Sequence, residues 1–369
     1  MKKFFENISN FIKLTKKISK LKKKIIFFSE GTHHLEHLKP FINFFLSRTD
    51  IIFISLSNKD EAKKIVEKNF HFYELNSYYF LNLFFKTIDN AYIFTSLPDL
   101  GQLYFKKHNN NKFLYIFHSL ASAHIQYNRL AFKYFDTIFC AGQHHYNELS
   151  IMKKKYNLHY NKLIKYGYPK IEKISENVDK TSSKSILIAS SWGENSITNT
   201  VSLELIDILL KKLDYKIIFR PHNMSLKIDK KKINTIKNSF KNSDKFHIDD
   251  SNSSYNSLID SKVLITDWGS TSADFFLGLN KPVIFIDTKM KKKNNNYFEI
   301  SKLAFEIDSR KDMGVIINSN KIREIDNNLI ESLYVRKNNN VRENLIKKYI
   351  YNFKNSEIIL EKELKNMNF

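Results

Sequence analysis

The 369-residue sequence contains one cysteine, eight glycines, five prolines and only seven arginines. A single cysteine, Cys140, excludes an intramolecular disulfide and a cysteine-rich zinc site, and a reducing, cytoplasmic setting is therefore expected. No run of 18 apolar residues occurs, so no transmembrane helix is predicted. Neither Gly-x-Gly-x-x-Gly after a strand nor Gly-x-x-x-x-Gly-Lys-Ser/Thr is present, which argues against dinucleotide oxidoreductases and P-loop enzymes.

Positive charge is abundant: 60 Lys and Arg residues against 38 Asp and Glu residues make a formal net charge of +22. Because 53 of the 60 are lysines, and Asn and Ile are also plentiful, part of this charge reflects coding bias. It also creates a positive potential toward phosphates or an anionic membrane, and both interpretations stay open. Hydrophobic residues make up 42% and aromatic residues 14%, which excludes wholesale disorder. The length of 369 residues is too long for one compact core and predicts two domains.

The N-terminal residues 1–24 have the pattern of a basic amphipathic helix. They lack the apolar core and the cleavage site of a signal peptide. Such a helix either lies in the headgroup region of an anionic membrane or packs on the protein body with its lysines in solvent. The apolar residues near one face are Phe4, Ile8, Phe11, Ile12, Ile18 and Leu21.

From residue 25 onward, short β-rich runs alternate with helical stretches, which predicts an α/β fold with parallel sheets. The first series of expected strands is Ile25–Ser29, Ile51–Leu56, Ala91–Thr95, Phe113–Phe117 and Thr137–Ala141. The second series is Ile186–Ala189, Lys216–Phe219, Lys245–Ile248, Val263–Thr266 and Val283–Ile286. Helices are expected at Leu35–Leu46, Asp60–Lys68, Tyr78–Lys86, Leu100–Lys107, Gln143–Tyr156, Thr198–Leu213, Lys230–Lys241, Tyr255–Asp260 and Ser272–Leu279.

The polar stretch Lys170–Ser185 is interpreted as a linker between two Rossmann-like halves. We therefore expect an N-terminal Rossmann-like domain at 25–170, a C-terminal Rossmann-like domain at 186–336, and a C-terminal helix within 337–369. Ligands of such sheets bind in the crevice beyond the carboxyl ends of the strands, so residues that follow strands are the candidates for chemistry.

One candidate follows the strand Phe113–Phe117, where His118 and Ser119 come next. A histidine after a buried strand, facing a cleft, is placed for general-base chemistry. The alternative is a histidine that only binds backbone groups at the strand end.

A second candidate is Arg220-Pro-His222, directly after the strand Lys216–Phe219. Pro221 ends the strand and disfavours helix at Arg220. The Arg220 guanidinium can hold a phosphate bidentately, and His222 can donate to a phosphate oxygen. The alternative is an ordinary loop.

The third candidate is the turn Asp267-Trp-Gly-Ser-Thr-Ser272, which lies between a strand and a short helix. Free backbone N–H groups and the helix dipole favour an anion at such a turn. Serine and threonine also cap helices, but a cap needs one hydroxyl and this turn offers three.

A weaker candidate follows the first strand, where Gly31 permits a tight turn next to Glu30 and His33. These side chains either bind the acceptor or are solvated. The pair His144 and His145 and the group around His33, His34 and His37 lack convincing carboxylate partners. We interpret them as solvated histidines and expect no metal site.

Four segments together resemble the CDP-glycerol glycerophosphotransferase family, the polymerases and primases of teichoic-acid-type and capsule backbones. Phe117-His118-Ser119 is similar to its Trp-His-Gly segment, and Tyr166-Gly-Tyr-Pro-Lys170 to its Gly-x-Pro segment. Arg220-Pro-His222 matches its Arg-Pro-His. Thr266-Asp-Trp-Gly-Ser-Thr271 resembles its Asp-Tyr-Ser-Ser turn, and Lys281-Pro-Val-Ile-Phe285 follows as in the family. Gly269 stands in place of the first serine of that turn, and Ser119 in place of the glycine.

The resemblance implies a GT-B fold and transfer of glycerol phosphate, or a similar polyol phosphate, from a CDP-activated donor to a glycan or lipid-linked hydroxyl, with CMP released. It implies that His118 is the general base and that His222 contacts the donor phosphates. No cofactor and no metal are expected, and the protein would act in the cytoplasm, peripherally on the inner face of the membrane. The donor side would comprise Arg220, Asp267, Gly269, Ser270, Thr271 and Ser272. The acceptor side would comprise Glu30, Gly31, His33 and Ser119.

Other functions remain open from the sequence. A GT-B glycosyltransferase that uses a nucleotide sugar would hold its diphosphate at the same turn, and a nucleotide-sugar epimerase of similar architecture is a weaker third. A non-catalytic basic protein could bind a membrane or nucleic acid. Arginine is scarce for base readout and no nucleic-acid motif occurs, so no nucleic-acid partner is expected.

Overall fold

The fold is that of a computed structural model, which describes residues 2–100, 105, 107–108, 110–177, 185–335 and 339–369. In these residues the strands form two sheets, with the orders β3-β2-β1-β4-β5-β6-β7 and β10-β9-β8-β11-β12-β13. The first sheet comprises β1 (Lys24–Ser29), β2 (Ile51–Ser55), β3 (Phe70–Glu74), β4 (Ala91–Thr95), β5 (Lys112–Ile116), β6 (Thr137–Cys140) and β7 (Lys162–Lys165). The second comprises β8 (Ser185–Ala189), β9 (Lys216–Arg220), β10 (Phe246–Ile248), β11 (Ser261–Thr266), β12 (Val283–Asp287) and β13 (Gly314–Asn318).

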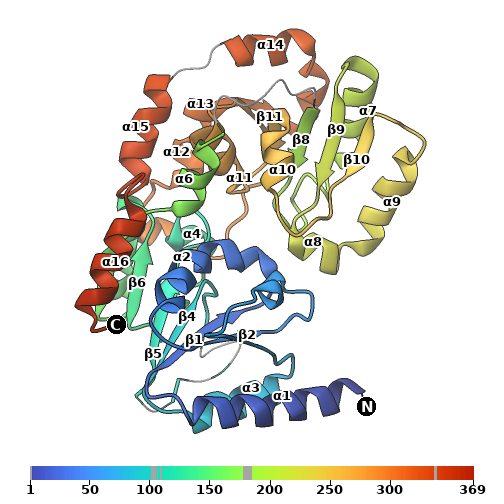
Figure 1. The fold of residues 1–369 in the computed structure, drawn as a ribbon. Coiled ribbons are helices and arrows are strands. Elements are labelled where there is room, and N and C mark those ends of the chain that lie inside the picture. The colour runs from blue at the N-terminus through green and yellow to red at the C-terminus, as the bar shows by residue number, and fades with distance from the viewer. Residues whose placement is uncertain (1, 101–104, 106, 109, 178–184, 336–338) are drawn as a thin grey trace.

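Helices surround both sheets (Figure 1). The α-helices are α1 (Lys2–Ile18), α2 (Leu35–Leu46), α3 (Tyr78–Thr87), α4 (Ala123–Gln126), α5 (Gln143–Lys155), α6 (Pro169–Ser175), α7 (Ser202–Lys212), α8 (Asn223–Ile228), α9 (Lys230–Phe240), α10 (Tyr255–Ile259), α11 (Thr271–Ala273), α12 (Phe305–Asp308), α13 (Arg310–Met313), α14 (Asn327–Val335), α15 (Asn339–Tyr349) and α16 (Ser356–Asn366). The shorter 3₁₀ and π elements are η1 (Thr32–His34), η2 (Glu61–Lys64), η3 (Asp274–Gly278), η4 (Tyr297–Glu299) and η5 (Ser319–Glu324).

All strand pairs within each sheet are parallel. The strand order reverses beside β1 in the first sheet and beside β8 in the second. Reversal points of this kind leave a crevice at the carboxyl ends of the strands. The α/β class and the two Rossmann-like halves expected from the sequence are therefore present, each with a reversal point of the kind at which ligands bind in such folds.

Three strands were not expected from the sequence. In β7, Lys162 and Lys165 are exposed and only Ile164 is buried, so this edge strand does not have an apolar run. β3 and β13 are likewise only partly buried. Apolar runs predict central strands because both faces of these strands are covered, and edge strands do not carry this signal.

Several expected helices differ from those observed. Only a short 3₁₀ turn, η2, lies within the helix expected at Asp60–Lys68. The first part of the expected linker Lys170–Ser185 forms α6, which buries Ile171 and Ile174, so it is packed rather than solvated. The expected helix Ser272–Leu279 consists of α11 followed by the π-helical η3. The helix expected at Leu100–Lys107 lies largely outside the described residues.

The two ends of the chain both pack on the first sheet's half of the molecule. α1 lies along α3, where Leu14 and Ile18 are buried and Phe11 contacts Phe80. Figure 1 shows α15 and α16 along one side, with α16 beside the first sheet. Leu364 of α16 is buried in the same core as α2. Among the described residues, no helix is both long enough and apolar enough to cross a membrane.

Candidate active site

The candidate site lies where the loops after β5 and β9 meet between the two halves. His118 follows β5, and His222 follows β9. The ring of His34 lies 4.0 Å from that of His33 and 5.2 Å from that of His118. His33 and His118 each contribute to lowering the pKa of His222. The structure therefore brings together residues that are far apart in the sequence, as expected for a cleft between two Rossmann-like halves.

His118 is half-buried, and its Nδ1 atom lies 2.8 Å from the carbonyl oxygen of Ser96 at the end of β4. A carbonyl only accepts, so Nδ1 carries the proton and Nε2 keeps its lone pair. Burial, the charge of His33 and nearby lysines lower the pKa of His118 to about 4. The imidazole is therefore neutral at pH 7, in the tautomer that can accept a proton at Nε2.

His222 has the opposite tautomer. It caps α8, and its Nδ1 atom accepts the backbone N–H of Met224 at 3.0 Å. The proton of a neutral imidazole is then on Nε2, which can donate to an anionic oxygen. Although part of the His222 ring is open to solvent, desolvation by the surrounding atoms and the charge of Lys291 lower its pKa to about 3. It is a neutral donor where His118 is a neutral acceptor.

Arg220 is tied into the second half. Its Nη1 atom lies 2.6 Å from Asp249 Oδ2 and 3.1 Å from Ser251 Oγ, and its Nη2 donates to the carbonyl of Ser251 at 2.8 Å. Three of its five N–H groups are thus used internally, which leaves Nε and one Nη2 hydrogen for a bidentate contact with a phosphate. Burial raises the pKa of Asp249, but bonds from Ser251 and Ser257 and the charge of Arg220 lower it more, to about 2.

Asp267 points into the protein rather than toward a donor. Its Oδ1 accepts the N–H groups of Ser191 and Trp268 at 2.7 Å, and its Oδ2 accepts that of Ile197 at 2.8 Å. The side chain is buried, at 1% exposure. Asp267 therefore fixes the loop after β8, which carries Trp192, against the turn after β11.

Of the three hydroxyls expected at the turn after Asp267, one is used within the turn itself: Ser272 is buried, and its Oγ donates to the Gly269 carbonyl at 3.1 Å. Ser270 precedes α11 without a side-chain capping bond. Within the described residues, Ser270 Oγ and Thr271 Oγ1 make no hydrogen bond to the protein, and both residues are partly exposed. These two hydroxyls can donate to an anion. Trp268 supports the turn, because its Nε1 donates to the Thr288 carbonyl at 2.9 Å.

The loop after β1 forms the opposite wall. Gly31 has φ +155°, a conformation that side-chain-bearing residues rarely adopt. Glu30, His33 and His34 offer ligand atoms that lie within 4.8 Å of one another, so a carboxylate does accompany these histidines and a divalent cation could be held there. Burial and the charge of Lys227 lower the pKa of His33 to about 4, and this lysine charge disfavours a cation.

The interpretation of the neighbouring histidines as solvated is wrong. His34, His37 and His145 have exposures of only 3%, 7% and 0%. His34 is the last residue of η1, and His37 and His145 lie in the first turns of α2 and α5, where their side chains are buried. Burial is the largest cause that lowers the pKa of all three imidazoles. They are therefore neutral structural groups.

Ser119, expected on the acceptor side, uses its hydroxyl in the loop itself. Its Oγ accepts the N–H of Ala121 at 2.9 Å, and the side chain is buried. The His118 carbonyl accepts the Tyr168 hydroxyl at 3.0 Å. Ser119 thus shapes the loop that holds His118.

Lys291 was missed from the sequence, where it belongs to a polar run interpreted as an exposed loop. Its Nζ lies 3.7 Å from the centroid of the Trp192 ring, and that ring lies 6.3 Å from the ring of His222. Burial and the charge of Lys293 lower the pKa of Lys291 to about 7, against an opposing effect of Asp267. No local pattern identifies such a residue, because its position depends on Trp192, which belongs to a distant part of the sequence.

Comparisons with known proteins bear on the family and the fold of the chain. A family model described as CDP-Glycerol:Poly(glycerophosphate) glycerophosphotransferase matches residues 17–307. No curated protein matches the sequence. Among solved structures, the wall teichoic acid polymerase TagF aligns over 94% of this chain and 90% of its own, with 16% identity and a TM-score of 0.59.

Two further structures share the fold. The UDP-GlcNAc 2-epimerase of Methanocaldococcus jannaschii, in complex with UDP-GlcNAc and UDP, has 13% identity and a TM-score of 0.56, over 94% of this chain and 99% of its own. S. aureus MnaA, in a structure with UDP, has 12% identity and a TM-score of 0.57, over 94% and 97%. At these identities the likeness shows the fold, which is the expected GT-B arrangement of two Rossmann-like domains.

Proposed function

Because the chain belongs to the CDP-glycerol:poly(glycerophosphate) glycerophosphotransferase family, we propose that it transfers glycerol phosphate from CDP-glycerol to a hydroxyl of a cell-surface glycan or lipid-linked acceptor and releases CMP. The family match spans all four segments on which the sequence resemblance rests and confirms that resemblance. The observation that carries the proposal is the pair of opposite tautomers, with a proton acceptor at His118 and a proton donor at His222.

In the proposed reaction, His118 Nε2 takes the proton of the acceptor hydroxyl. The hydroxyl oxygen attacks the glycerol-bearing phosphorus in line, and the bond from this phosphorus to the bridging oxygen breaks. CMP leaves with the electron pair of that bond. Charge on the bridging and non-bridging oxygens is stabilised by His222 Nε2–H, by Lys291 and by the turn that carries Ser270 and Thr271. Such preplaced donors supply most of the catalysis in phosphoryl transfer.

The donor test compares nucleotides directly. The purified protein is incubated with CDP-glycerol, with UDP-GlcNAc and with a lipid-linked glycerol-phosphate acceptor, and CMP and UDP are measured separately. We expect acceptor-dependent release of CMP alone. Release of UDP would identify a glycosyltransferase, and conversion of the UDP-sugar without CMP release would identify an epimerase. Either result would overturn the proposal.

We also propose that α1 holds the enzyme on the inner face of an anionic membrane. Its side chains Leu14 and Ile18 pack into the protein, but Phe4 and Phe5 are 58% and 63% exposed beside the lysines of the same helix. Tyr79 of α3, which packs along α1, is exposed as well. Aromatic side chains next to lysines favour the headgroup region of a bilayer.

The membrane proposal is tested with vesicles. The wild-type protein should sediment with phosphatidylglycerol vesicles and not with phosphatidylcholine vesicles. The double variant Phe4→Ser/Phe5→Ser should remain in the supernatant with unchanged thermal stability, because neither ring is buried. The same exchange at exposed Val66, far from α1 in sequence, serves as the control. Equal sedimentation of the double variant and the wild type would contradict the proposal.

A further inference from the structure

The loop that carries His118 has almost no regular structure, yet several of its backbone N–H and C=O groups form hydrogen bonds with side chains. We use "His118 segment" for residues 118–126, which contain only the four-residue helix α4. The carbonyls of Leu120 and Ala121 lie 2.8 Å and 3.0 Å from Nε2 of His144 and His145 in α5. Side chains that meet buried backbone groups in this way fix a loop in one conformation.

Two buried carboxylates accept hydrogen bonds from consecutive backbone N–H groups of this segment. One carboxylate belongs to each half of the protein. The N–H of Ala123 donates to Glu148 Oε2 at 2.6 Å, and Glu148 belongs to α5 in the first half. The N–H of Ser122 donates to Glu306 Oε2 at 3.0 Å, and Glu306 belongs to α12, between β12 and β13 of the second sheet. Glu306 Oε1 also accepts from Gln126 Nε2 at 2.8 Å.

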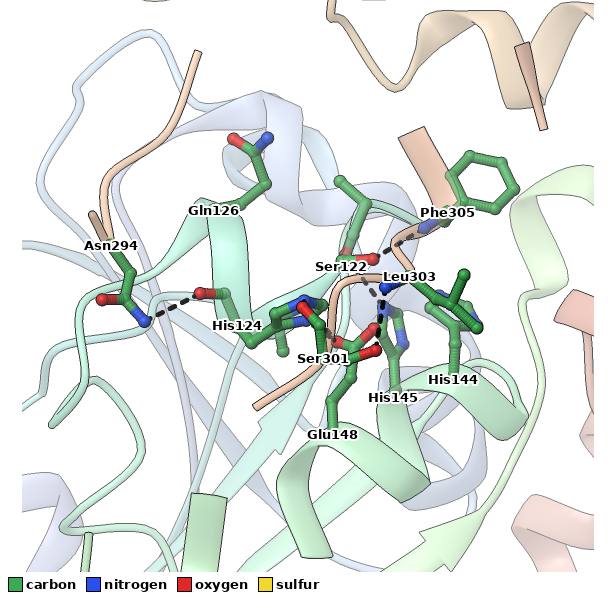
Figure 2. A network of polar contacts seen from close by, with 12 residues as sticks. Ser122, His124, Gln126, His144, His145, Glu148, Asn294, Ser301, Leu303 and Phe305 are labelled. Carbon is green, nitrogen blue, oxygen red and sulfur yellow. Dashed lines mark hydrogen bonds and ion pairs between the residues drawn. The ribbon is translucent and has the colours of Figure 1, made fainter. Parts of the chain in front are cut away.

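The second half makes further bonds to the same segment. Figure 2 shows Asn294 and Phe305 reaching it from the second half. Asn294 Nδ2 donates to the carbonyl of His124 at 3.0 Å, and the Phe305 N–H donates to Ser122 Oγ at 2.8 Å. His124 Nε2 lies 3.1 Å from the Ser301 carbonyl.

The ionisable side chains of this network are buried and lie close together. His124 Nδ1 lies 3.2 Å from Glu148 Oε2, with both side chains at most 6% exposed. Burial lowers the pKa of His124, but contact with Glu148 and the charge of Glu306 raise it more. Burying such groups costs desolvation that well-packed apolar residues would not, so stability alone is a weak reason for the network. A defined conformation of the His118 segment is a better reason for these buried contacts.

We propose that Glu306 is a positioning residue for the transfer reaction: by binding Ser122 and Gln126 it holds the His118 segment in register with the donor half. This inference rests on the proposed function. Glu306 is connected to Lys291 by the segment 291–306. This segment also contacts the His118 segment, because the Lys293 N–H donates to the Ile125 carbonyl at 2.9 Å. The same contacts therefore set the distance between the base, on one half, and the phosphate-binding groups, on the other.

The test exploits the two acceptor roles of Glu306. In Glu306→Gln one oxygen becomes an NH₂ group, so either Ser122 or Gln126 loses its acceptor while the side-chain volume is kept. The double variant Glu306→Gln/Gln126→Glu restores both bonds, because the new amide accepts from the Ser122 N–H through its oxygen and donates to the new carboxylate through its nitrogen. The control is Glu299→Gln, which removes a more exposed ion pair, 3.4 Å long, to Lys155 between the same two halves.

We expect Glu306→Gln to lower kcat for CMP release about 10- to 100-fold with little change in KM for CDP-glycerol, since small misplacements of a catalytic group have effects of this size. The exchanged pair should recover most of kcat, and Glu299→Gln should match the wild type. If Glu306→Gln fails to fold, Gln126→Met removes one bond only and should show a smaller loss in the same direction. A variant that lowers thermal stability but keeps kcat, or an exchanged pair without recovery, would overturn the proposal.

Amide hydrogen exchange separates this proposal from the proposed function. Amides of the His118 segment should exchange faster in Glu306→Gln, because whichever of the two bonds is lost ties this segment to the second half, and they should exchange at the wild-type rate in Glu299→Gln. If the wild-type protein releases no CMP from CDP-glycerol, the proposed function fails, and exchange within the His118 segment then decides the positioning role. Unchanged exchange in Glu306→Gln would overturn that role independently of activity.

Discussion

The ammonium group of Lys291 lies over the indole ring of Trp192, with its Nζ 3.7 Å from the ring centroid. The same indole lies beside His222, the neutral donor of the second half. A cation over an aromatic face is stabilised without a carboxylate partner, so its charge is not cancelled by an anion. In the proposed reaction, Lys291 is therefore positioned to neutralise the diphosphate of the donor.

The first prediction concerns the pH dependence of donor binding. The pKa of Lys291 is lowered to about 7 by burial and Lys293, so its charge is lost as the pH rises through this value. The affinity for CDP-glycerol should fall above pH 7. Lys291→Arg should keep its affinity up to pH 9, because a guanidinium stays protonated.

Titration calorimetry with CDP-glycerol between pH 6 and pH 9 measures this effect. Lys291→Gln should bind about 10- to 100-fold more weakly at pH 6.5, the range for one hydrogen bond to a charged group. Lys292→Gln, from the exposed neighbouring position, should behave as the wild type. A wild-type affinity that is constant with pH would show that Lys291 does not contact the donor.

The second prediction separates the two histidines. In His118→Asn the amide nitrogen can still donate to the Ser96 carbonyl, but the acceptor at Nε2 is gone. We expect kcat to fall about 10²- to 10⁴-fold with CDP-glycerol binding retained, as for loss of a general base. In His222→Asn the amide oxygen can still cap Met224, but the Nε2–H donor is gone, so both binding and kcat should decrease.

Pre-steady-state measurement of CMP release, together with calorimetry, distinguishes the two histidine variants. Loss of donor binding in His118→Asn, with binding unchanged in His222→Asn, would reverse the assigned roles. Near-normal turnover of His118→Asn would exclude His118 as the base.

The third prediction is that stability falls in acid before the carboxylates titrate. The folded-state pKa of His118 is lowered to about 4, whereas an unfolded histidine has a pKa near 6.5. Between these values the unfolded state binds the extra proton, so the free energy of unfolding decreases as the pH falls. The slope from this one group is at most about 1.4 kcal/mol per pH unit.

Urea denaturation at pH 7, 6 and 5 tests the acid sensitivity. His118→Asn should show a smaller loss of stability over this range than the wild type, because one of the buried neutral imidazoles is absent. A substitution at the exposed Val66, which does not titrate, should not change the slope. Equal slopes for wild type and His118→Asn would contradict the lowered pKa of His118.

The central strands, and the candidate residues at their carboxyl ends, could be predicted from the sequence. β4 has the expected bounds, Ala91–Thr95, because a strand covered on both faces is a continuous apolar run. His118 and His222 could be placed because each follows such a run, and the carboxyl ends of parallel strands gather at one edge of a sheet. Local pattern is sufficient for features of this kind.

The features missed depend on contacts between segments far apart in the chain. Asp267 belongs to a turn that resembles a phosphate site, but its carboxylate faces inward because three backbone N–H groups, two of them from a distant segment, need an acceptor. Glu306 and Lys291 have no motif at all. The role of Glu306 follows from burial and from partners in the other half, and that of Lys291 from burial and from Trp192 in a distant loop of the same half. A linear pattern contains neither.

The fourth prediction concerns two glycines that differ in their surroundings. A Cβ atom on Gly142, at the start of α5, would lie 1.8 Å from the backbone oxygen of Tyr349 in α15. Gly142→Ala should therefore displace α15 and cost about 1–3 kcal/mol of stability, as overpacking does. A Cβ on Gly269 would meet nothing nearer than 3.4 Å, so Gly269→Ala should fold normally. Thermal unfolding of both variants measures the difference. A lower melting temperature for Gly269→Ala than for Gly142→Ala would contradict the prediction.

The last prediction concerns the ion pair of Arg220 with Asp249, 2.6 Å long with exposures of 11% and 10%. Removing one partner of a buried pair leaves the other charge unpaired and typically costs about 3–5 kcal/mol. Asp249→Asn and Arg220→Met should both lower stability, and the double variant should lose less than the sum. Only Arg220→Met should also weaken CDP-glycerol binding, because Nε and the remaining Nη2 hydrogen belong to Arg220. Equal weakening of binding in both single variants would show that the guanidinium acts on the site only through the fold of the loops after β9 and β10.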